Sequence, residues 1–397
     1  VLRDGVVAGL HNIPFLQMVQ LDFRAWARLQ TVASQVHPSS QVRPTYADHA
    51  LSGEATVVCV TGAAGFVGSW LVTLCLQRGY HVRACVRSVD DDRKVGFLKA
   101  MAAYKDGRLS LHSADMTVPG AYDKIFDGCS TVFHPAEVFM SVGFGRNQEQ
   151  ASADFTFPSL HAAAVAAAKN VVDSINKSSS VTRLVYTASI ASMMGASLRK
   201  NPIVDESCDT AGDLNDYGPT KRLTEKFFSF SAYASGGKWS VVIGNPGDIV
   251  GPILSPHHAN ETWQGMVGLI MQGVPVAQQV AGRPWYLTDV RDVAEAEIRL
   301  AESKTVRSGE RYLLVSGDLV PQESLGSRAM ELFPEWDCAT TVAPFPGAKT
   351  VIRTHPVYYR VQLRNDKIRH EVGLDFRSFD DTFKAMLDSL VSVGGIR

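Results

Sequence analysis

The sequence has no excess of charge of either sign: 39 Lys and Arg residues against 40 Asp and Glu residues give a formal net charge of −1. This balance argues against a nucleic-acid or anionic-membrane binder, because such proteins usually carry a basic surface. A long hydrophobic run is also missing, since no apolar stretch approaches the roughly 20 residues that span a bilayer. The six cysteines show no CxxC pair and no zinc-finger spacing. We therefore expect a soluble protein with free thiols in a reducing compartment, the cytoplasm or an organelle interior, and no metal site.

What is present is an ordinary globular composition, with 45% hydrophobic and 20% charged residues over 397 positions. That length predicts more than one lobe. Near the start, Phe15, Phe23 and Trp26 recur at helical spacing, and residues 37–50 read as a linker. We assign residues 1–55 to an N-terminal extension and linker. We expect its apolar face to pack on the same chain; docking of a protein partner is the second interpretation.

A β-rich run, a glycine turn and a helical segment follow one another directly after this boundary. Residues 56–61 are mostly apolar and β-branched, as in a buried parallel strand. They run into the turn Gly62-Ala63-Ala64-Gly65-Phe66-Val67-Gly68, which is followed by a helical pattern over 69–78 and a second strand over 79–87. Strand, glycine turn, helix and strand within about 30 residues predict a βαβ unit.

The three glycines of this turn have the spacing of a dinucleotide-binding site. Gly62 allows the tight turn, Gly65 lets the backbone approach a pyrophosphate, and Gly68 lets the helix pack close to the strand. The helix N-terminus then presents unpaired N–H groups and a partial positive charge to the phosphates. The sequence therefore predicts a nicotinamide dinucleotide site at this turn.

The end of the second strand bears on the choice between NAD and NADP. An NAD site usually has an acid there, which holds the ribose 2′-hydroxyl, whereas this chain has Arg87, with acids only at 90–92. Arg87 can meet a 2′-phosphate with a charged fork, and Arg83 or Lys94 can add to it. We predict NADP(H) as the cofactor. The alternative, kept open by the acidic run, is that these are solvated surface cations.

Strand and helix patterns continue to alternate along the chain. A long, Ala-rich helix is expected within 151–177, where small side chains allow close packing against a sheet. Such alternation predicts an α/β fold, a Rossmann-type doubly wound parallel sheet with right-handed crossovers, whose ligands bind at the carboxyl ends of the strands. Further strands are expected over residues 108–112, 131–134, 182–187 and 239–243.

A serine, a tyrosine and a lysine stand where this fold places its chemistry. Ser189 comes just after the strand 182–187, and Tyr217 and Lys221 lie four apart on a helix expected to reach about Ala234, so the two share one face. A phenol ordinarily ionises near pH ~10, and a nearby ammonium lowers its pKa. Such a tyrosine can give a proton to a carbonyl oxygen as hydride arrives, while Ser189 hydrogen-bonds the same oxygen. We predict these three residues to be catalytic.

Together these features resemble an extended short-chain dehydrogenase/reductase, in the branch of the dihydroflavonol reductases, cinnamoyl-CoA reductases and 3β-hydroxysteroid dehydrogenases. The resemblance covers about residues 55–390 and is most specific over 60–72, Val-Thr-Gly-Ala-Ala-Gly-Phe-Val-Gly-Ser-Trp-Leu-Val. It implies that Arg87 binds the nucleotide and that Asp115 and Met116 lie beside the adenine.

The same resemblance places the segment 133–136 (Phe-His-Pro-Ala) beside the cofactor and the segment 245–252 at its nicotinamide end. It also puts Ser189, Tyr217 and Lys221 on the family's catalytic triad. The cofactor-binding positions that the residues and the resemblance give together are Gly62, Gly65, Phe66, Val67, Gly68, Arg87, Lys94, Asp115, Met116, Ala136, Tyr217, Lys221 and Pro246.

Some positions depart from the pattern of this branch. An Asn that often supports the active site from the long helix is replaced by Ala164, and the residues around Tyr217 lack the Trp and Cys of the cinnamoyl-CoA reductase signature. These departures weaken any specific substrate name but leave the triad intact.

The chain divides into three parts in our prediction. Residues 1–55 are the extension, 56–252 form the NADP-binding domain with the catalytic residues, and 253–397 form mainly a smaller substrate-binding lobe, with part of the chain returning to the sheet. The pair His257–His258 is expected in a surface loop rather than at a metal. An apolar pocket is expected from Trp263, Met266, Trp285 and Phe345.

The expected function is the NADPH-dependent reduction of a ketone or aldehyde, or the reverse oxidation of an alcohol, on a bulky apolar small molecule. The alternative is a non-catalytic, nucleotide-bound subunit of a larger assembly. The N-terminal extension and Ala164 support this alternative, and the intact triad argues against it. A nucleotide-sugar epimerase is the third interpretation, and it is disfavoured by Arg87 where an NAD-binding acid would stand.

Overall fold

The computed structural model describes residues 56–137, 160–195, 201–210, 217–273, 284–339 and 360–393. The predicted amphipathic helix of the N-terminal extension lies outside the described residues, as does Phe345.

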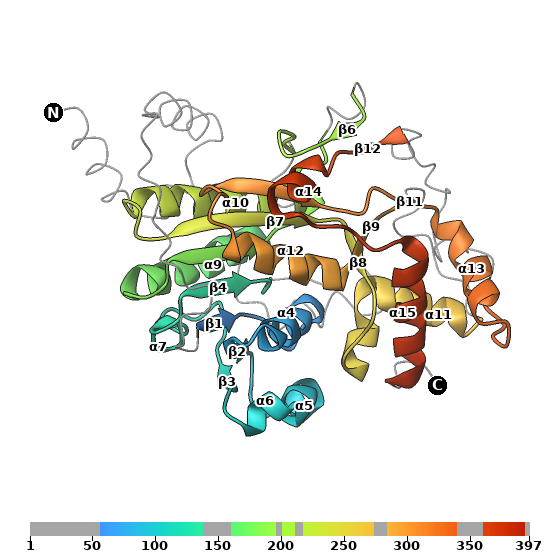
Figure 1. Cartoon of the computed structure of the whole chain (residues 1–397), viewed down its shortest axis with the longest axis horizontal. Helices are drawn as coiled ribbons and strands as arrows, with labels where there is room; N and C mark the ends of the chain where they lie inside the picture. Colours follow the sequence, from blue (N-terminus) through green and yellow to red (C-terminus); the bar gives the residue numbers. More distant parts are fainter. Residues whose placement is uncertain are drawn as a thin grey trace.

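A seven-stranded parallel sheet forms the centre of the described chain, in the order β10-β7-β5-β4-β1-β2-β3 (Figure 1). The chain runs outward from β1 in one direction and then from β4 in the other, so the sheet is doubly wound, and the predicted Rossmann-type fold is confirmed. The strands are β1 (Val57–Val60), β2 (His81–Val86), β3 (Leu109–Ser113), β4 (Thr131–His134), β5 (Arg183–Thr187), β7 (Ser240–Pro246) and β10 (Glu310–Leu314).

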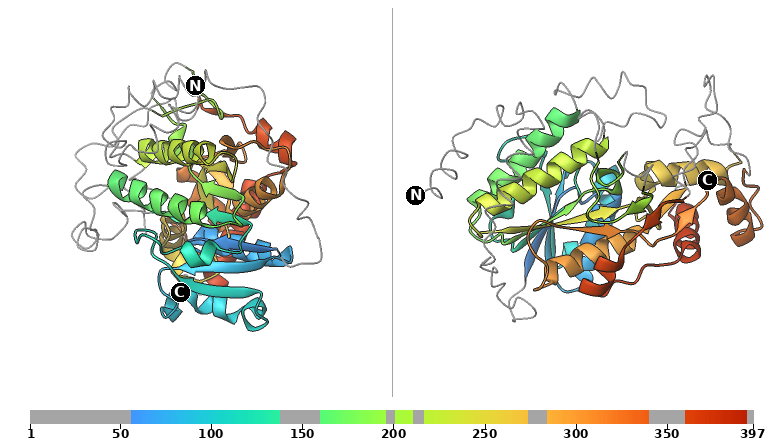
Figure 2. Two further views of the ribbon diagram at one scale, coloured as in Figure 1. Left: turned by 90° about the vertical axis from the view of Figure 1, so that its left-hand side faces the viewer. Right: turned by 90° about the horizontal axis from the view of Figure 1, so that it is seen from above.

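Helices cover both faces of the sheet, as Figure 2 shows from two further directions. The helices α9 (Leu160–Lys177) and α10 (Tyr217–Ala234) pack on each other over one face. On the other face α4 (Phe66–Gln77) packs against α12 (Val290–Glu302). Shorter helices around this domain are α5 (Asp92–Ala100), α6 (Ala102–Lys105), α7 (Asp123–Phe126) and α14 (Asp366–Val372).

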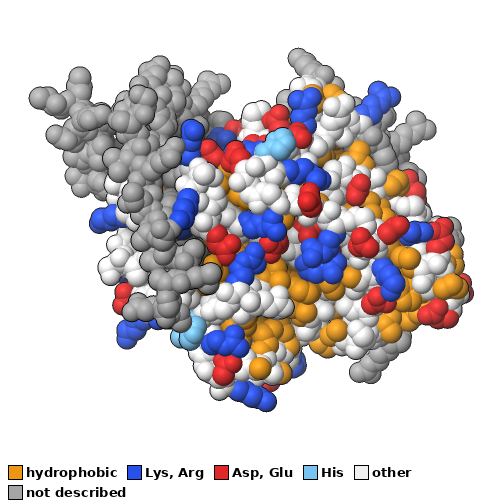
Figure 3. Space-filling view, viewed as in Figure 1, with side chains coloured by type: hydrophobic (Ala, Val, Ile, Leu, Met, Phe, Trp, Pro, Cys, Tyr) orange, Lys and Arg blue, Asp and Glu red, His pale blue; other side chains and the backbone are white. Residues whose placement is uncertain are grey.

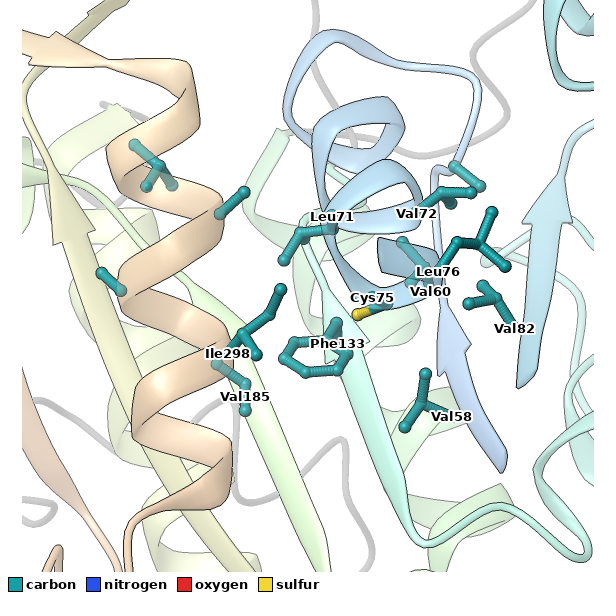
Figure 4. Packing of buried hydrophobic residues seen from close by; sticks show 14 of the residues in the cluster. Val58, Val60, Leu71, Val72, Cys75, Leu76, Val82, Phe133, Val185 and Ile298 are labelled. Carbon is teal, nitrogen blue, oxygen red and sulfur yellow. The ribbon is translucent and has the colours of Figure 1, made fainter. Parts of the chain in front are cut away.

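Apolar side chains of α4 and α12 fill the space above the strands (Figure 4). Leu71 of α4 and Ile298 of α12 are both fully buried, and they lie over Phe133 of β4 and Val185 of β5. Burying each such side chain stabilises the fold by about 1.5–3 kcal/mol. This packing fixes the start of α4 against the end of β1.

A smaller lobe is built around the three-stranded sheet β11-β9-β8. Trp285 is fully buried at the start of β9, its ring 5.6 Å from that of Trp263, and it shares an apolar cluster with Met266 and Phe383. The expected apolar pocket is therefore wrong for Met266 and Trp285, because these side chains fill the interior of the lobe. Elements of the lobe are β8 (Asp248–Val250), β9 (Trp285–Asp289), β11 (Leu319–Val320), α11 (Thr262–Met271), α13 (Leu325–Leu332) and α15 (Phe379–Ser392).

A two-stranded sheet, β6 (Ile203–Val204) with β12 (Gln362–Leu363), completes the strands of the described chain. On the face shown in Figure 3, basic and acidic side chains are interspersed over α12 and its neighbours. Among them, Glu295 pairs with Arg78 at 2.7 Å and with Arg299 at 2.6 Å. Within the described ranges, no helix is long and apolar enough to cross a bilayer, and no group of three or more His, Cys, Asp or Glu residues could hold a metal.

Candidate active site

The predicted site residues converge at the carboxyl ends of the central strands. The strand order reverses between β1 and β4, and ligands of open α/β sheets bind in the crevice outside such a switch point. Gly62 lies two residues past the end of β1, and Ala136 and Glu137 lie two and three residues past the end of β4. Ser189 follows β5, the next strand in the sheet. The topology thus brings the glycine turn and the predicted triad to one edge.

The glycine turn has no room for larger residues. Gly62 has φ +60°, and a Cβ on it would lie 3.1 Å from Ala136. A Cβ on Gly68 would lie 2.3 Å from the carbonyl oxygen of Gly62, closer than any real contact. Helix α4 begins right after Gly65, whose position as N-cap supplies no side-chain acceptor, so the first N–H groups of the helix remain for a ligand. These features fit a pyrophosphate.

Two histidines of the smaller lobe hold this turn from outside. The Nε2 atoms of His257 and His258 both lie within hydrogen-bond distance of the carbonyl oxygen of Ala64, at 2.8 and 2.9 Å. His258 is fully buried, and burial lowers its pKa to about 4, so the ring is neutral at physiological pH. The expectation of a surface loop is therefore wrong for His258, because this ring packs against Phe66 and Phe97 and fixes the turn.

Arg87 stands exposed just past the end of β2, near Asp115. Desolvation works against ionisation of Asp115, but two hydrogen bonds from Thr117, at 2.7 and 2.8 Å, and the charge of Arg87 lower its pKa overall. Lys94, in α5, is also exposed. The structure thus brings Arg87 and Asp115 together beside the crevice.

Arg83 does not join them. Its guanidinium donates to the carbonyl oxygen of Ile125 at 2.8 Å and to that of Asp127, at the end of α7. Because the side chain is already engaged with these carbonyls, the interpretation of Arg83 as an additional phosphate ligand is wrong.

The side chains of Phe66 and Val67 pack into the apolar core rather than towards the crevice, so what they can offer a phosphate is backbone N–H. Met116 is half-buried against α9, and its carbonyl oxygen accepts from Asn170 at 3.0 Å. Pro246 is the buried last residue of β7.

Tyr217 and Ser189 lie together because helix α10 approaches the segment after β5 closely. Tyr217 is the first residue of α10, and its hydroxyl is hydrogen-bonded to Ser189. Gly218 makes this approach possible: a Cβ on it would lie 2.6 Å from the carbonyl oxygen of Ala191. Tyr217 still exposes 37% of its surface, which leaves its ring accessible from outside.

Lys221 is buried one helical turn further along α10. Its ammonium donates to the carbonyl oxygen of Thr187 at 3.1 Å and lies 5.1 Å from the ring centre of Tyr186 and 5.8 Å from that of Tyr217. It also forms an ion pair with Glu137. Burial works against the charge of Lys221, but Glu137 together with the nearby phenols of Tyr186 and Tyr217 outweighs it, so the pKa of Lys221 lies well above its ordinary value.

The structure corrects one expectation about the phenol. Desolvation raises the pKa of Tyr217 more strongly than the charge of Lys221 lowers it, and Glu137 raises it further. The net shift is therefore upward, against the predicted lowering, because the sequence pattern shows the lysine but neither the burial of the phenol nor the carboxylate beside it. A raised pKa keeps the phenol protonated at neutral pH.

A buried polar network supports Ser189 from behind. Glu225, one turn beyond Lys221 on the same face of α10, is fully buried. It accepts hydrogen bonds from Ser192 at 2.5 Å and Asn245 at 2.6 Å, and Asn245 also donates to the carbonyl oxygen of Ser189 at 3.2 Å. The network thereby ties the Ser189 loop to α10 and β7.

Two arginines balance the buried charge of Glu225. Arg311 of β10 lies 2.9 Å from its carboxylate and donates to Ser192 at 3.0 Å, and Arg222 donates to the same carboxylate at 2.9 Å. A buried carboxylate is tolerated only when it is paired and hydrogen-bonded in this way.

Sequence reasoning missed Glu137, Glu225 and Arg311. The spacing of Glu225, four residues after Lys221, was a usable signal, because it places both on one helix face. Glu137 directly follows the segment 133–136, at the sheet edge where ligands bind. Arg311 gave no signal, since no strand was expected at β10.

Known proteins are similar to this chain in sequence. The model of the NAD dependent epimerase/dehydratase family matches residues 58–314. A cinnamoyl-CoA reductase of Medicago truncatula, CAD2, is 32% identical over 347 residues, covering 85% of this chain and 97% of the relative. A putative anthocyanidin reductase of Ginkgo biloba is 35% identical over 281 residues, covering 66% of this chain and 76% of the relative.

Solved structures share the fold. The yeast methylglyoxal/isovaleraldehyde reductase Gre2, complexed with NADPH, superimposes with a TM-score of 0.66 at 22% identity, over 86% of this chain and all (100%) of that one. Vestitone reductase from alfalfa (Medicago sativa) superimposes with a TM-score of 0.62 at 22% identity, over 86% of this chain and 99% of that one.

Proposed function

Because the chain belongs to the NAD dependent epimerase/dehydratase family, in its extended short-chain dehydrogenase/reductase branch, we propose that it is an NADPH-dependent reductase of a ketone or aldehyde. The observation that carries the proposal is the hydrogen-bonded pair Ser189–Tyr217 with Lys221 beside it, at the same sheet edge as the glycine turn. The named reductases among its relatives support the same chemistry. We propose a bulky apolar carbonyl compound as the substrate.

The residues at the switch point fit NADPH. The turn at Gly62, Gly65 and Gly68 and the first N–H groups of α4 would hold the pyrophosphate. Arg87 would meet the 2′-phosphate with its guanidinium fork, and Lys221 would hold the nicotinamide ribose. Bound there, NADPH supplies the hydride.

The protein's own contribution is to place and protonate the carbonyl oxygen. The Ser189 hydroxyl donates a hydrogen bond that orients this oxygen, and the Tyr217 hydroxyl gives up its proton to it as negative charge develops. Lys221 stabilises the phenolate that remains, because an ammonium close to the ring lowers the free energy of the ionised form. In the reverse direction the phenolate takes the proton from an alcohol.

The proposal is tested by NADPH consumption with a panel of carbonyl substrates. The panel contains aliphatic aldehydes, dihydroflavonols, a cinnamoyl-CoA thioester and ketosteroids. Turnover of one class, with product identified by mass, supports a reductase and names its substrate class. Tight NADPH binding with no turnover of any class would instead favour the non-catalytic, nucleotide-bound subunit.

Replacing Arg87 by Ala should weaken NADPH binding by about 1.5–3 kcal/mol, the range of a charged hydrogen bond, and leave NADH binding nearly unchanged. The reason is that only NADPH carries the 2′-phosphate. Dissociation constants for both cofactors, measured by calorimetry, test this.

The matched control is Arg93→Ala, which removes another arginine of the same segment whose side chain is 92% exposed. It should leave both constants unchanged. An equal loss for NADPH and NADH in the Arg87 variant contradicts the assignment.

A further inference from the structure

The ion pair between Glu137 and Lys221 is a feature of the site that the sequence motifs did not predict. Glu137 comes directly after the segment 133–136, three residues past the end of β4, and its carboxylate reaches the ammonium of Lys221 on α10, across the edge of the sheet. The side chain of Lys221 is 5% exposed and that of Glu137 21% exposed. A pair so shielded from water interacts more strongly than a surface pair.

A small cavity next to this pair has room for about one water molecule. Helix α9 contributes only the methyl groups of Ala164 and Ala168 to its lining. No charged side chain therefore reaches the cavity from that helix, and Glu137 is the one acid among the lining residues.

Other titratable groups face Lys221, but none of them replaces Glu137. Burial lowers the pKa of His134 to about 3, so this ring is neutral. Burial raises the pKa of Glu297 to about 8, so at neutral pH it is mostly the uncharged acid, which accepts from Thr187 at 2.6 Å. Glu225, one turn beyond Lys221 on α10, is paired with Arg222 and Arg311. Among the described residues, the other groups near Lys221 are His134 from β4, Tyr186 from β5, Tyr217 from α10 and Glu297 from α12.

We propose that Glu137 is a positioning residue of the active site, which holds the Lys221 ammonium beside Tyr217 and keeps both groups in their protonated forms. The expected effect on reductase activity rests on the proposed function, whereas the effect of Glu137 on the protonation of Lys221 and Tyr217 does not. A negative charge at this place favours the proton on each partner, and the pair titrates as a unit. Glu137 therefore biases the site towards carbonyl reduction, which needs the protonated phenol.

Removing the charge of Glu137 has the same direction of effect whether Lys221 or Tyr217 loses its proton first. Glu137 raises the pKa of Lys221 and that of Tyr217. Without its charge, whichever proton is lost first as the pH rises is lost at lower pH. Ionisation of Glu297 in the same range occurs with and without Glu137, so the difference between the two proteins isolates Glu137.

Glu137→Gln should therefore lose reductase activity at lower pH than the unchanged protein. We expect the ratio of the NADPH-dependent rate at pH 9 to that at pH 7 to be at least about threefold smaller in the variant. Glu137→Asp, which restores the charge, should recover part of this ratio. Glu331→Gln, which removes an exposed carboxylate on α13, should leave it unchanged.

A second measurement is independent of turnover. The ionisation of Tyr217 is followed by phenolate absorbance in the cofactor-free protein, with and without Glu137→Gln. From each titration, that of the same protein carrying Tyr217→Phe in addition is subtracted, so that the signal of Tyr217 remains. We expect the Tyr217 signal to rise at lower pH in the variant. If the proposed substrate class is wrong, the rates fail but this titration still tests Glu137. An unmoved titration, or one that moves equally in Glu331→Gln, overturns the proposal.

Discussion

Replacing Tyr217 by Phe should lower turnover by about 10²-fold or more while NADPH still binds. The substitution keeps the ring over Lys221 and removes only the hydroxyl, which is the group that hydrogen-bonds Ser189 and carries the proton. Because the pKa of Tyr217 is raised, the phenol holds that proton at neutral pH, which suits the direction of reduction. Turnover and NADPH affinity, measured on the same preparation, separate the loss of proton transfer from a loss of binding.

Tyr233→Phe is the matched control for this experiment. Tyr233 lies on the same helix, α10, but is 54% exposed and lies more than three turns from Lys221 along the helix. The Tyr233→Phe variant should have the same turnover as the unchanged protein. Undiminished activity in Tyr217→Phe would mean that another group donates the proton.

The sheet could be predicted from the sequence because its strands carry a simple signal. Buried parallel strands are short apolar runs, and the runs at β1 and β5 stand out between helical patterns. Strand β10 was missed because it opens with Glu310 and Arg311, which do not read as apolar. These two residues are stabilised by partners distant in sequence, such as Glu225, and no local pattern records such pairs.

In the candidate site, too, the residues with a local sequence pattern could be predicted and those that depend on distant contacts could not. Tyr217 and Lys221 could be predicted because a helix converts a spacing of four into a shared face. Glu137 comes from a different strand, and its approach to Lys221 depends on how α10 lies across the sheet. The upward shift of the Tyr217 pKa comes first from burial of the phenol and then from Glu137. A motif of three residues contains neither of these, and it therefore gave the wrong sign.

The glycine turn offers the strongest test of how the fold makes the cofactor site. Gly68→Ala would place a Cβ 2.3 Å from the carbonyl oxygen of Gly62 and 2.8 Å from its carbonyl carbon. Both are backbone atoms, so neither can rotate away, and α4 must move off β1. We expect the free energy of unfolding to fall by about 1–3 kcal/mol and NADPH binding to be lost, because the first N–H groups of α4 move with the helix.

Gly96→Ala makes the same chemical change in α5, at a position where a Cβ would meet nothing within 4 Å. It should keep NADPH binding and gain up to about 1 kcal/mol of stability, the helix propensity difference between the two residues. Denaturant unfolding and NADPH titration of both variants give the comparison. If Gly68→Ala binds NADPH as well as Gly96→Ala does, then close contact between α4 and the turn is not what shapes the pyrophosphate site, and the phosphates must be held elsewhere on the edge of the sheet.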